Sequence, residues 1–136
     1  MYQINTQALK LVGEELDKEI GLLVDLLAQP LESVDWSECN RGLSQLHGVF
    51  SLLEMVGGEM LLGEMQETLI KAEGSSLDAT AVNTVRHSLE LMPGYVSQLQ
   101  MHGKDSPLFL LPEINQLRAA RKQPLLNEYQ LLNGLM

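Results

Sequence analysis

The chain of 136 residues is long enough for one domain with a substantial core and too short for two ordinary domains. Its net charge of −9, from 9 Lys+Arg against 18 Asp+Glu, disfavours nucleic acid and anionic membrane surfaces as partners. Cys39 is the only cysteine, no secretory signal pattern opens the chain, and no apolar run approaches the ~20 residues that span a bilayer. We therefore expect a cytoplasmic protein without membrane insertion.

Apolar residues recur every three or four positions through the first hundred residues, which is the spacing of amphipathic helices. The composition agrees, since Leu and Met dominate and aromatic residues make up only 4%. The first helix is expected to begin near Asn5 or Thr6 and to run to about Gln29. Pro30 then stops it, because proline cannot continue a helix.

Two further helices are expected around a pair of glycines. The first of them covers about Val34–Val56, and Gly57-Gly58 is expected to end it. The second covers about Glu59–Ala72, and the sequence Gly74-Ser75-Ser76 then indicates a turn. The glycine pair is thus expected to connect two neighbouring helices.

A fourth long helix is expected to begin near Leu77 or Asp78 and to continue to about Met101. It contains Pro93-Gly94 near its middle. Proline removes a helical hydrogen bond and glycine weakens a helix, so a kink or an interruption is expected there.

The C-terminal quarter is expected to hold shorter elements. His102–Ser106 is polar and loop-like, and the apolar run Leu108–Leu111 precedes a short helix over about Pro112–Arg121. The last segment, Pro124–Met136, is rich in leucine and either packs back on the other helices or frays.

These elements predict one all-α domain over residues 1–136. Long helices with short connections favour an antiparallel up-down helical bundle, with a four-helix core over about 5–102 and a C-terminal helical extension over about 106–134. The residues expected on the inner faces are Leu9, Val12, Leu16, Ile20, Leu23 and Leu27; Trp36, Leu43, Leu46, Val49, Phe50, Leu53 and Val56; Met60, Leu61, Met65 and Leu69; and Val82, Val85, Leu89, Met92, Val96 and Leu99.

The polar side of the second helix carries the main candidate site. A helical wheel places His47 at the edge of the apolar stripe, partly exposed, with Ser44 and Gly48 further toward solvent. A neutral imidazole is nucleophilic near pH 7, so a histidine there, beside a small residue, can accept a phosphoryl group from a partner protein. His47 is the candidate phosphoacceptor, and Ser44, His47, Gly48 and Ser51 form the candidate binding face. A surface histidine without a role is the simpler interpretation.

Other chemistries fit the sequence less well. Ser44 has no positioned base other than His47, and no third residue or nucleophile elbow completes a hydrolase site. His47, Glu54, His87 and His102 are scattered, so no metal is expected, and His87 and His102 should face solvent. No phosphate loop, dinucleotide fingerprint or kinase signature is present. We therefore expect no cofactor and, at most, a phosphotransfer intermediate.

Arg118, Arg121 and Lys122 form a small basic group in an otherwise acidic chain. Two interpretations stay open at this point. The group either contacts an acidic partner or stabilises the C-terminal end of its helix.

Two segments carry a resemblance to a known family. Gln45–Met65, QLHGVFSLLEMVGGEMLLGEM, and Leu91–Leu126, with LMPGYVSQLQ and LLPEINQLRAARKQPLL, are similar to the N-terminal domain of the large hybrid chemosensory histidine kinases of type IV pilus (twitching-motility) systems. They are also similar to pilus regulatory scaffold proteins that share this domain. The resemblance implies a histidine-containing phosphotransfer (HPt) fold in a chemotaxis-like two-component system. It implies as partners a response regulator or other signalling proteins of that system.

The acceptor pattern of HPt domains is H-x-x-K-G, and this chain departs from it. When Gly48 takes the glycine position, Ser44 takes the histidine position and His47 the lysine position. A rival register keeps His47 as the acceptor, but then Phe50 replaces the lysine and Ser51 the glycine. We favour the first register, which extends without a gap into the following helix.

In the favoured register the phosphorylatable histidine is missing, which favours a degenerate (pseudo-HPt) domain kept for protein interaction. The alternative is an active phosphotransfer domain with His47 as acceptor. A purely structural dimerisation bundle is a third possibility, and it would leave a large apolar face uncovered in the monomer.

Overall fold

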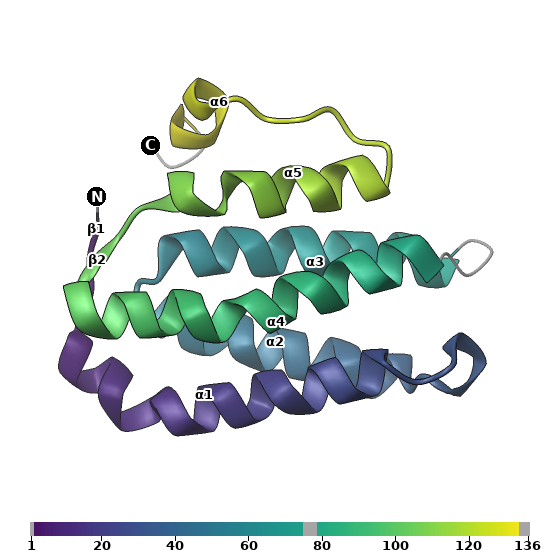
Figure 1. The fold of residues 1–136 in the computed structure, drawn as a ribbon, viewed down its shortest axis with the longest axis horizontal. Helices are drawn as coiled ribbons and strands as arrows, with labels where there is room; N and C mark the ends of the chain where they lie inside the picture. The colour runs from purple at the N-terminus through teal and green to yellow at the C-terminus, as the bar shows by residue number, and fades with distance from the viewer. Residues whose placement is uncertain (1, 75–78, 134–136) are drawn as a thin grey trace.

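The computed structural model describes residues 2–74 and 79–133 and is predominantly helical, which confirms the predicted all-α class. Figure 1 shows the four long helices lying side by side along the longest axis of the molecule. The elements in chain order are β1 (Tyr2–Gln3), α1 (Thr6–Leu27), the 3-10 helix η1 (Leu31–Ser33), α2 (Trp36–Leu52), α3 (Val56–Gly74), α4 (Ala79–His102), β2 (Lys104–Asp105), the 3-10 helix η2 (Pro107–Leu110), α5 (Leu111–Ala120) and α6 (Glu128–Asn133).

The four long helices form a ring of neighbours. α1 packs on α2 and on α4, and α3 packs on the same two helices from the other side. α5 then lies on α3 and α4, and α6 contacts η2. Leu131 of α6 is fully buried, so the part of the C-terminal segment that the structure describes packs back on the other helices.

The core follows the predicted periodicity closely. The inner residues predicted for α4 are all buried, and those of α1 are buried except for the half-buried Val12. The other half-buried residues that we expected to face inward are Trp36, Val49, Leu53, Val56 and Met60. They lie at the edges of the apolar stripes of α2 and α3 or near the turn between these helices, where neighbouring helices cover them only in part.

α1 begins where the sequence indicates. Asn5 is its N-cap, and the Asn5 side-chain oxygen accepts a hydrogen bond of 3.0 Å from the backbone N–H of Ala8. The helix ends at Leu27, two positions before the predicted Gln29 and ahead of Pro30.

The prediction that Gly57-Gly58 ends the second helix is wrong. α2 ends at Leu52, four positions before the predicted Val56, and α3 already begins at Val56. The glycine pair therefore lies in the first turn of α3, and a turn over residues 53–55 connects the helices.

Glu54 makes this turn without a glycine. Its φ of 58° lies in the left-handed region. The N–H of Met55 donates to the carbonyl of Phe50 at 2.9 Å, and the N–H of Glu54 donates to that of Ser51 at 3.1 Å. These two bonds are the pair of a Schellman C-cap, which satisfies carbonyls at the end of a helix. Met55 and Phe50 are both fully buried, so the core holds a conformation that Glu54 does not favour by itself.

α4 runs without a break through Pro93, so of the two outcomes expected at Pro93-Gly94, a kink or an interruption, the interruption is wrong. Proline costs the helix one hydrogen bond, but the buried side chains of Met92 and Val96 on either side hold it against the core. The turn predicted at 74–76 and the helix start predicted at 77 or 78 lie largely outside the described residues; within them, α3 extends to Gly74.

The segment expected to be a loop after α4 contains a short strand. β2 pairs antiparallel with β1, with Tyr2 opposite Asp105 and Gln3 opposite Lys104. Gly103 precedes it with a φ of 69°, and its N–H donates to the carbonyl of Leu99 at 2.8 Å. This left-handed glycine ends α4 and turns the chain toward β1.

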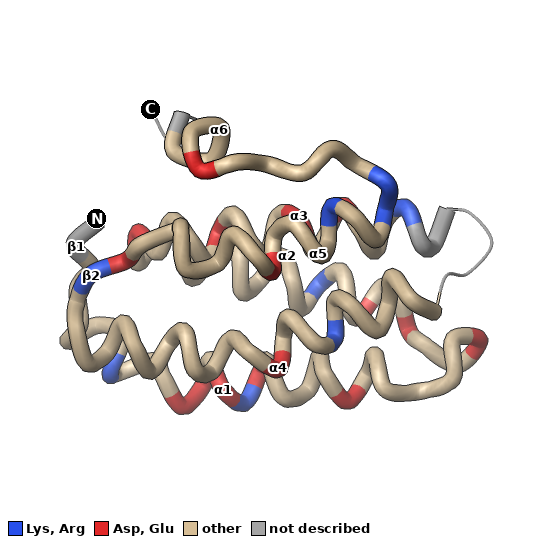
Figure 2. Tube along the Cα trace, turned by 45° about the horizontal axis from the view of Figure 1, so that its top comes forward, with Lys and Arg blue, Asp and Glu red and all other residues tan. Residues whose placement is uncertain are grey.

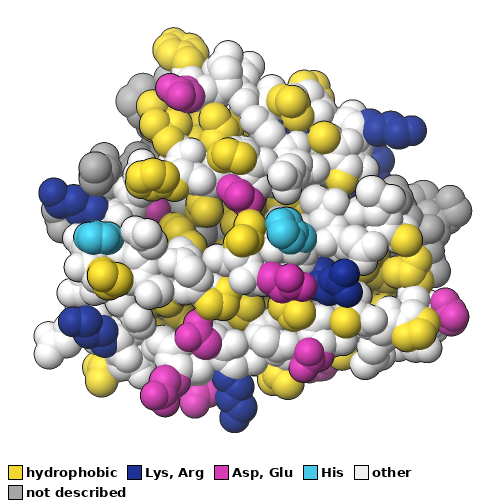
Figure 3. Space-filling view, in the orientation of Figure 1, with side chains coloured by type: hydrophobic (Ala, Val, Ile, Leu, Met, Phe, Trp, Pro, Cys, Tyr) yellow, Lys and Arg dark blue, Asp and Glu magenta, His cyan; other side chains and the backbone are white. Residues whose placement is uncertain are grey.

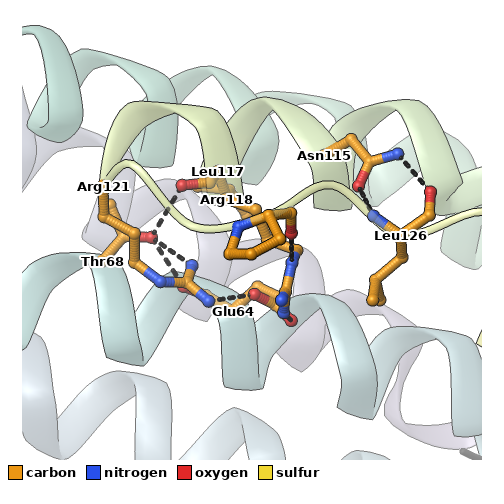
Figure 4. A network of polar contacts seen from close by, with 8 residues as sticks. Glu64, Thr68, Asn115, Leu117, Arg118, Arg121 and Leu126 are labelled. Atoms are coloured by element: carbon orange, nitrogen blue, oxygen red, sulfur yellow. Dashed lines mark hydrogen bonds and ion pairs between the residues drawn. The ribbon is translucent and has the colours of Figure 1, made fainter.

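The basic group at the end of α5 has its acidic partner inside the chain. Figure 2 shows Lys and Arg gathered at the C-terminal end of α5 and in the turn after it. Arg118 Nη1 lies 3.2 Å from Glu64 Oε2 of α3, and Arg121 Nη2 contacts the other carboxylate oxygen, Oε1. Arg121 Nη1 also donates to Thr68 Oγ1 at 3.0 Å. The sequence suggested that these arginines contact an acidic partner or stabilise the C-terminal end of their helix. The structure shows instead that they attach α5 to α3 (Figure 4).

A second set of hydrogen bonds attaches the chain that follows α5 to α5 itself (Figure 4). The side-chain amide of Asn115 donates to the carbonyl of Leu126 at 2.9 Å and accepts from the N–H of Leu126 at 2.8 Å. Arg118 Nε donates to the carbonyl of Pro124. These contacts fix the chain after α5 to α5, and the contacts with Glu64 and Thr68 fix α5 to α3.

Candidate functional site

The predicted binding face forms one compact surface on α2, which we call the α2 patch: Ser44, His47, Gly48 and Ser51. Positions 44 and 48, and positions 47 and 51, are four residues apart, while 44 and 47, and 48 and 51, are three apart. Residues at these spacings are neighbours on a helix surface. Ser44, Gly48 and Ser51 are exposed and His47 is half-buried, as the helical wheel predicted.

The opposite side of α2 fixes the patch in place. Leu43, Leu46 and Phe50 are buried to 1% exposure or less. At Gly42 a Cβ atom would lie 2.7 Å from Leu23 Cδ2 of α1, so the glycine permits the two helices to approach closely. The patch therefore stands on a rigid helix rather than on a mobile loop.

The polar contacts around the patch do not build a catalytic relay. Gln66 Nε2 of α3 donates to Ser44 Oγ at 3.3 Å. Arg41, one turn earlier, is held by Glu38 and donates to Gln45. Within residues 2–74 and 79–133, the imidazole of His47 makes no hydrogen bond or ion pair. Ser44 thus has an amide as its neighbour instead of a base, and nothing described activates it as a nucleophile.

Gly48 leaves the centre of the patch open. A Cβ atom at this position would meet nothing within 4 Å, so no contact inside the chain requires a glycine there. Leu52, four residues further along the helix, exposes 86% of its surface. The patch and its edge therefore offer a small, flat polar area beside an exposed apolar side chain.

A second polar cluster lies at the N-terminal end of α3. Asp105 Oδ2 accepts hydrogen bonds of 2.9 Å from the N–H of Gly57 and from the hydroxyl of Tyr95. The Tyr95 hydroxyl in turn accepts from the N–H of Gly58 at 2.8 Å. The free N–H groups that begin α3 are thus capped by residues from β2 and α4.

This cluster explains the glycine pair. A Cβ atom at Gly57 would lie 2.9 Å from Asp105 Oδ1, and one at Gly58 would lie 2.6 Å from a ring carbon of Phe50. Tyr95 also packs against Phe50, with ring centroids 6.5 Å apart. This role could not be predicted from the sequence, because the capping residues are 37 and 48 positions away and no local pattern marks them.

Burial shifts the pKa values of this cluster. Asp105 is 0% exposed, and burial raises the pKa of its carboxyl above the usual range, against the opposing effect of the hydrogen bonds from Gly57 and Tyr95. Its Oδ1 has no hydrogen-bond partner. Burial and the nearby Asp105 also raise the pKa of Tyr95. The arrangement is typical of a structural cap, since Asp105 Oδ2 and the Tyr95 hydroxyl are both engaged with the backbone N–H groups that begin α3.

The remaining sequence candidates do not converge. His87 and His102 are exposed, as predicted. Cys39 is fully buried, and burial raises the pKa of its thiol to about 11, which makes it unreactive. In the described part of the chain, no three His, Cys, Asp or Glu side chains gather as a metal site would need. Nor does any helix described there have the length and apolar character to cross a membrane.

Comparison of the chain with protein-family models, with curated proteins and with solved structures finds no match. The resemblance in the sequence and the geometry of the α2 patch therefore carry the functional argument.

Proposed function

We propose that the protein is an HPt-like signalling domain of a type IV pilus chemosensory system, acting in the cytoplasm as a degenerate protein-interaction module. Its α2 patch would bind a response regulator or another signalling protein of that system. In this proposal the ring of α1 to α4 is an antiparallel up-down bundle of the HPt type. The C-terminal extension, α5 and α6, is an addition to that core.

The observation that carries the proposal is the exposure pattern along α2. In the register that places Ser44 at the histidine position, Ser44 and Gly48 both face solvent, as an acceptor and its small neighbour must. In the rival register Phe50 takes the lysine position, yet Phe50 is 0% exposed. A lysine is almost never fully buried without a partner, so the first register fits the packing of this helix better.

The same register argues for binding without phosphotransfer. Serine forms a phosphate ester that does not pass its phosphoryl group on as phosphohistidine does. Ser44 also has only Gln66 as its hydrogen-bond partner among the described residues. The second candidate function, an active phosphotransfer domain with His47 as acceptor, is favoured by one observation: the imidazole is partly exposed on a rigid helix.

A binding titration tests the interaction. Gly48→Arg places a long side chain in the centre of the patch, where a Cβ atom meets no neighbour, so the fold should be preserved. We expect this variant to lose affinity for a pilus-system response regulator by about tenfold or more. Gly21→Arg is the matched control, because Gly21 is an exposed, equally open glycine on α1. Equal binding by both variants would contradict the proposal.

A further inference from the structure

A concave site lies between the C-terminal half of α4 and the segment formed by β2, η2 and the start of α5. Its volume is about 690 Å³, within the range of pockets that enclose a small organic ligand. Hydrophobic side chains gather on this face of the molecule (Figure 3). The apolar residues that line the pocket include Leu91, Leu99, Phe109 and Leu110.

The walls of the pocket expose apolar surface to water. Phe109 is 80% exposed and Leu91 is 42% exposed, although both are large hydrophobic residues. Beneath them, Asp105 Oδ2 and the Tyr95 hydroxyl already bind each other and the N-terminal end of α3. The pocket therefore offers mainly apolar contacts to whatever enters it.

The charges at the rim are unevenly placed. His102 ends α4 and Lys104 lies in β2, so both lie at one end of the pocket, where α4 meets β2 (Figure 1). Leu91 lies eleven residues earlier on α4, about 16 Å away at the helical rise of 1.5 Å per residue. In the described part of the chain, Lys104 has no acidic partner, whereas Arg118 and Arg121 share Glu64.

We propose that this pocket binds a free single-chain amphiphile with one anionic head group, such as a medium-chain fatty carboxylate. The alkyl chain lies along α4 from Leu99 toward Leu91, under Phe109. The carboxylate lies at the end marked by Lys104 and His102. Glu113, the acidic residue on the rim, disfavours a second anionic group on the ligand, so a monoanion fits better than a dianion.

Gly94 supplies a precise means of blocking the pocket. It lines the pocket in the middle of α4, and a Cβ atom there would meet nothing within 4 Å. Gly94→Leu should therefore fill the site without straining the protein, and it should strengthen the helix, because glycine is a poor helix former. Gly21→Leu is the matched control, with the same change at an open helical glycine on α1, outside the pocket.

The test is isothermal titration of the protein with sodium dodecanoate below its critical micelle concentration. We expect saturable binding at one site, weakened by about tenfold or more in Gly94→Leu and unchanged in Gly21→Leu. Thermal unfolding of both variants shows whether they are folded. Lys104→Ala should weaken dodecanoate binding by about threefold or more and leave binding of the uncharged dodecyl maltoside unchanged.

Several results would overturn the proposal. They are an absence of dodecanoate binding, equal binding by Gly94→Leu and wild type, or equal affinity for dodecanoate and the cationic dodecyltrimethylammonium. Sedimentation with anionic phospholipid vesicles that is lost in Gly94→Leu, without binding of free dodecanoate, would assign the pocket to a membrane lipid instead. The α2 patch plays no part in these experiments, so their results test the pocket independently of the proposed function.

Discussion

Replacing Asp105 with alanine should destabilise the fold by about 2–6 kcal/mol, because it removes the acceptor shared by two donors, one buried and one partly buried. The N–H of Gly57 and the hydroxyl of Tyr95 each lie 2.9 Å from Asp105 Oδ2. A buried donor left without a partner costs about 1–3 kcal/mol, and two such donors give the stated range. Such a loss is a large part of the roughly 5–15 kcal/mol that stabilises a domain.

Asp105→Asn keeps a hydrogen-bond acceptor at this position but cannot carry a negative charge. The amide oxygen can accept from both donors, so this variant should unfold close to wild type. Because the folded-state pKa of Asp105 is raised above its ordinary value of 3.8, the folded protein holds this proton more tightly than the unfolded chain does. The stability that the folded protein gains from this tighter proton binding is therefore fully present below the unfolded pKa. It is lost as the pH rises through the folded pKa.

Urea unfolding of wild type and both variants, from about pH 4 to about pH 8, measures these effects. The free energy of unfolding of wild type minus that of Asp105→Asn should fall as the pH rises. Tyr95→Phe is a useful comparison, because it removes the acceptor for Gly58 while keeping the aromatic ring. Asp105 does not cap α3 as described if Asp105→Ala unfolds at the same urea concentration as wild type. The same holds if the free energy of unfolding of wild type minus that of Asp105→Asn rises with pH.

Three further substitutions test other parts of the structure. Glu54→Gly should stabilise the protein by about 1 kcal/mol in urea unfolding, because glycine adopts the left-handed conformation at low cost; a loss of stability would contradict the assigned turn. Glu64→Ala should cost roughly 2–4 kcal/mol, since it leaves Arg118 and Arg121 unpaired at 19% and 9% exposure; an unchanged melting temperature would show that α5 does not depend on this contact. Leu46→Ala, at 1% exposure, should cost roughly 2–5 kcal/mol, and a smaller effect in calorimetry would mean that the core refills the cavity.

The helices could be predicted because their signals are local. The stripe of buried leucines in α1 and the N-cap at Asn5 depend only on residues three or four positions apart. The exposure of Ser44, Gly48 and Ser51 followed from the same geometry.

The errors arose where distant segments meet. Gly57-Gly58 resembles a helix end, because glycine commonly follows the last turn of a helix. Here Glu54 takes that position, and the glycines are needed for the approach of Phe50 and of the capping residues of α3. Likewise, Arg118 and Arg121 at the end of α5 form ion pairs with Glu64, which lies more than fifty positions earlier. No local sequence pattern predicts this pairing.

The central claim is that the α2 patch binds a partner without taking up its phosphoryl group. Incubation with a response regulator of a pilus chemosensory system, carrying a radiolabelled aspartyl phosphate, tests it most directly. We predict that the regulator keeps or hydrolyses its label and that this chain gains none. Acid-labile label on the wild-type chain that is lost in His47→Gln would contradict the claim and identify His47 as an active phosphoacceptor.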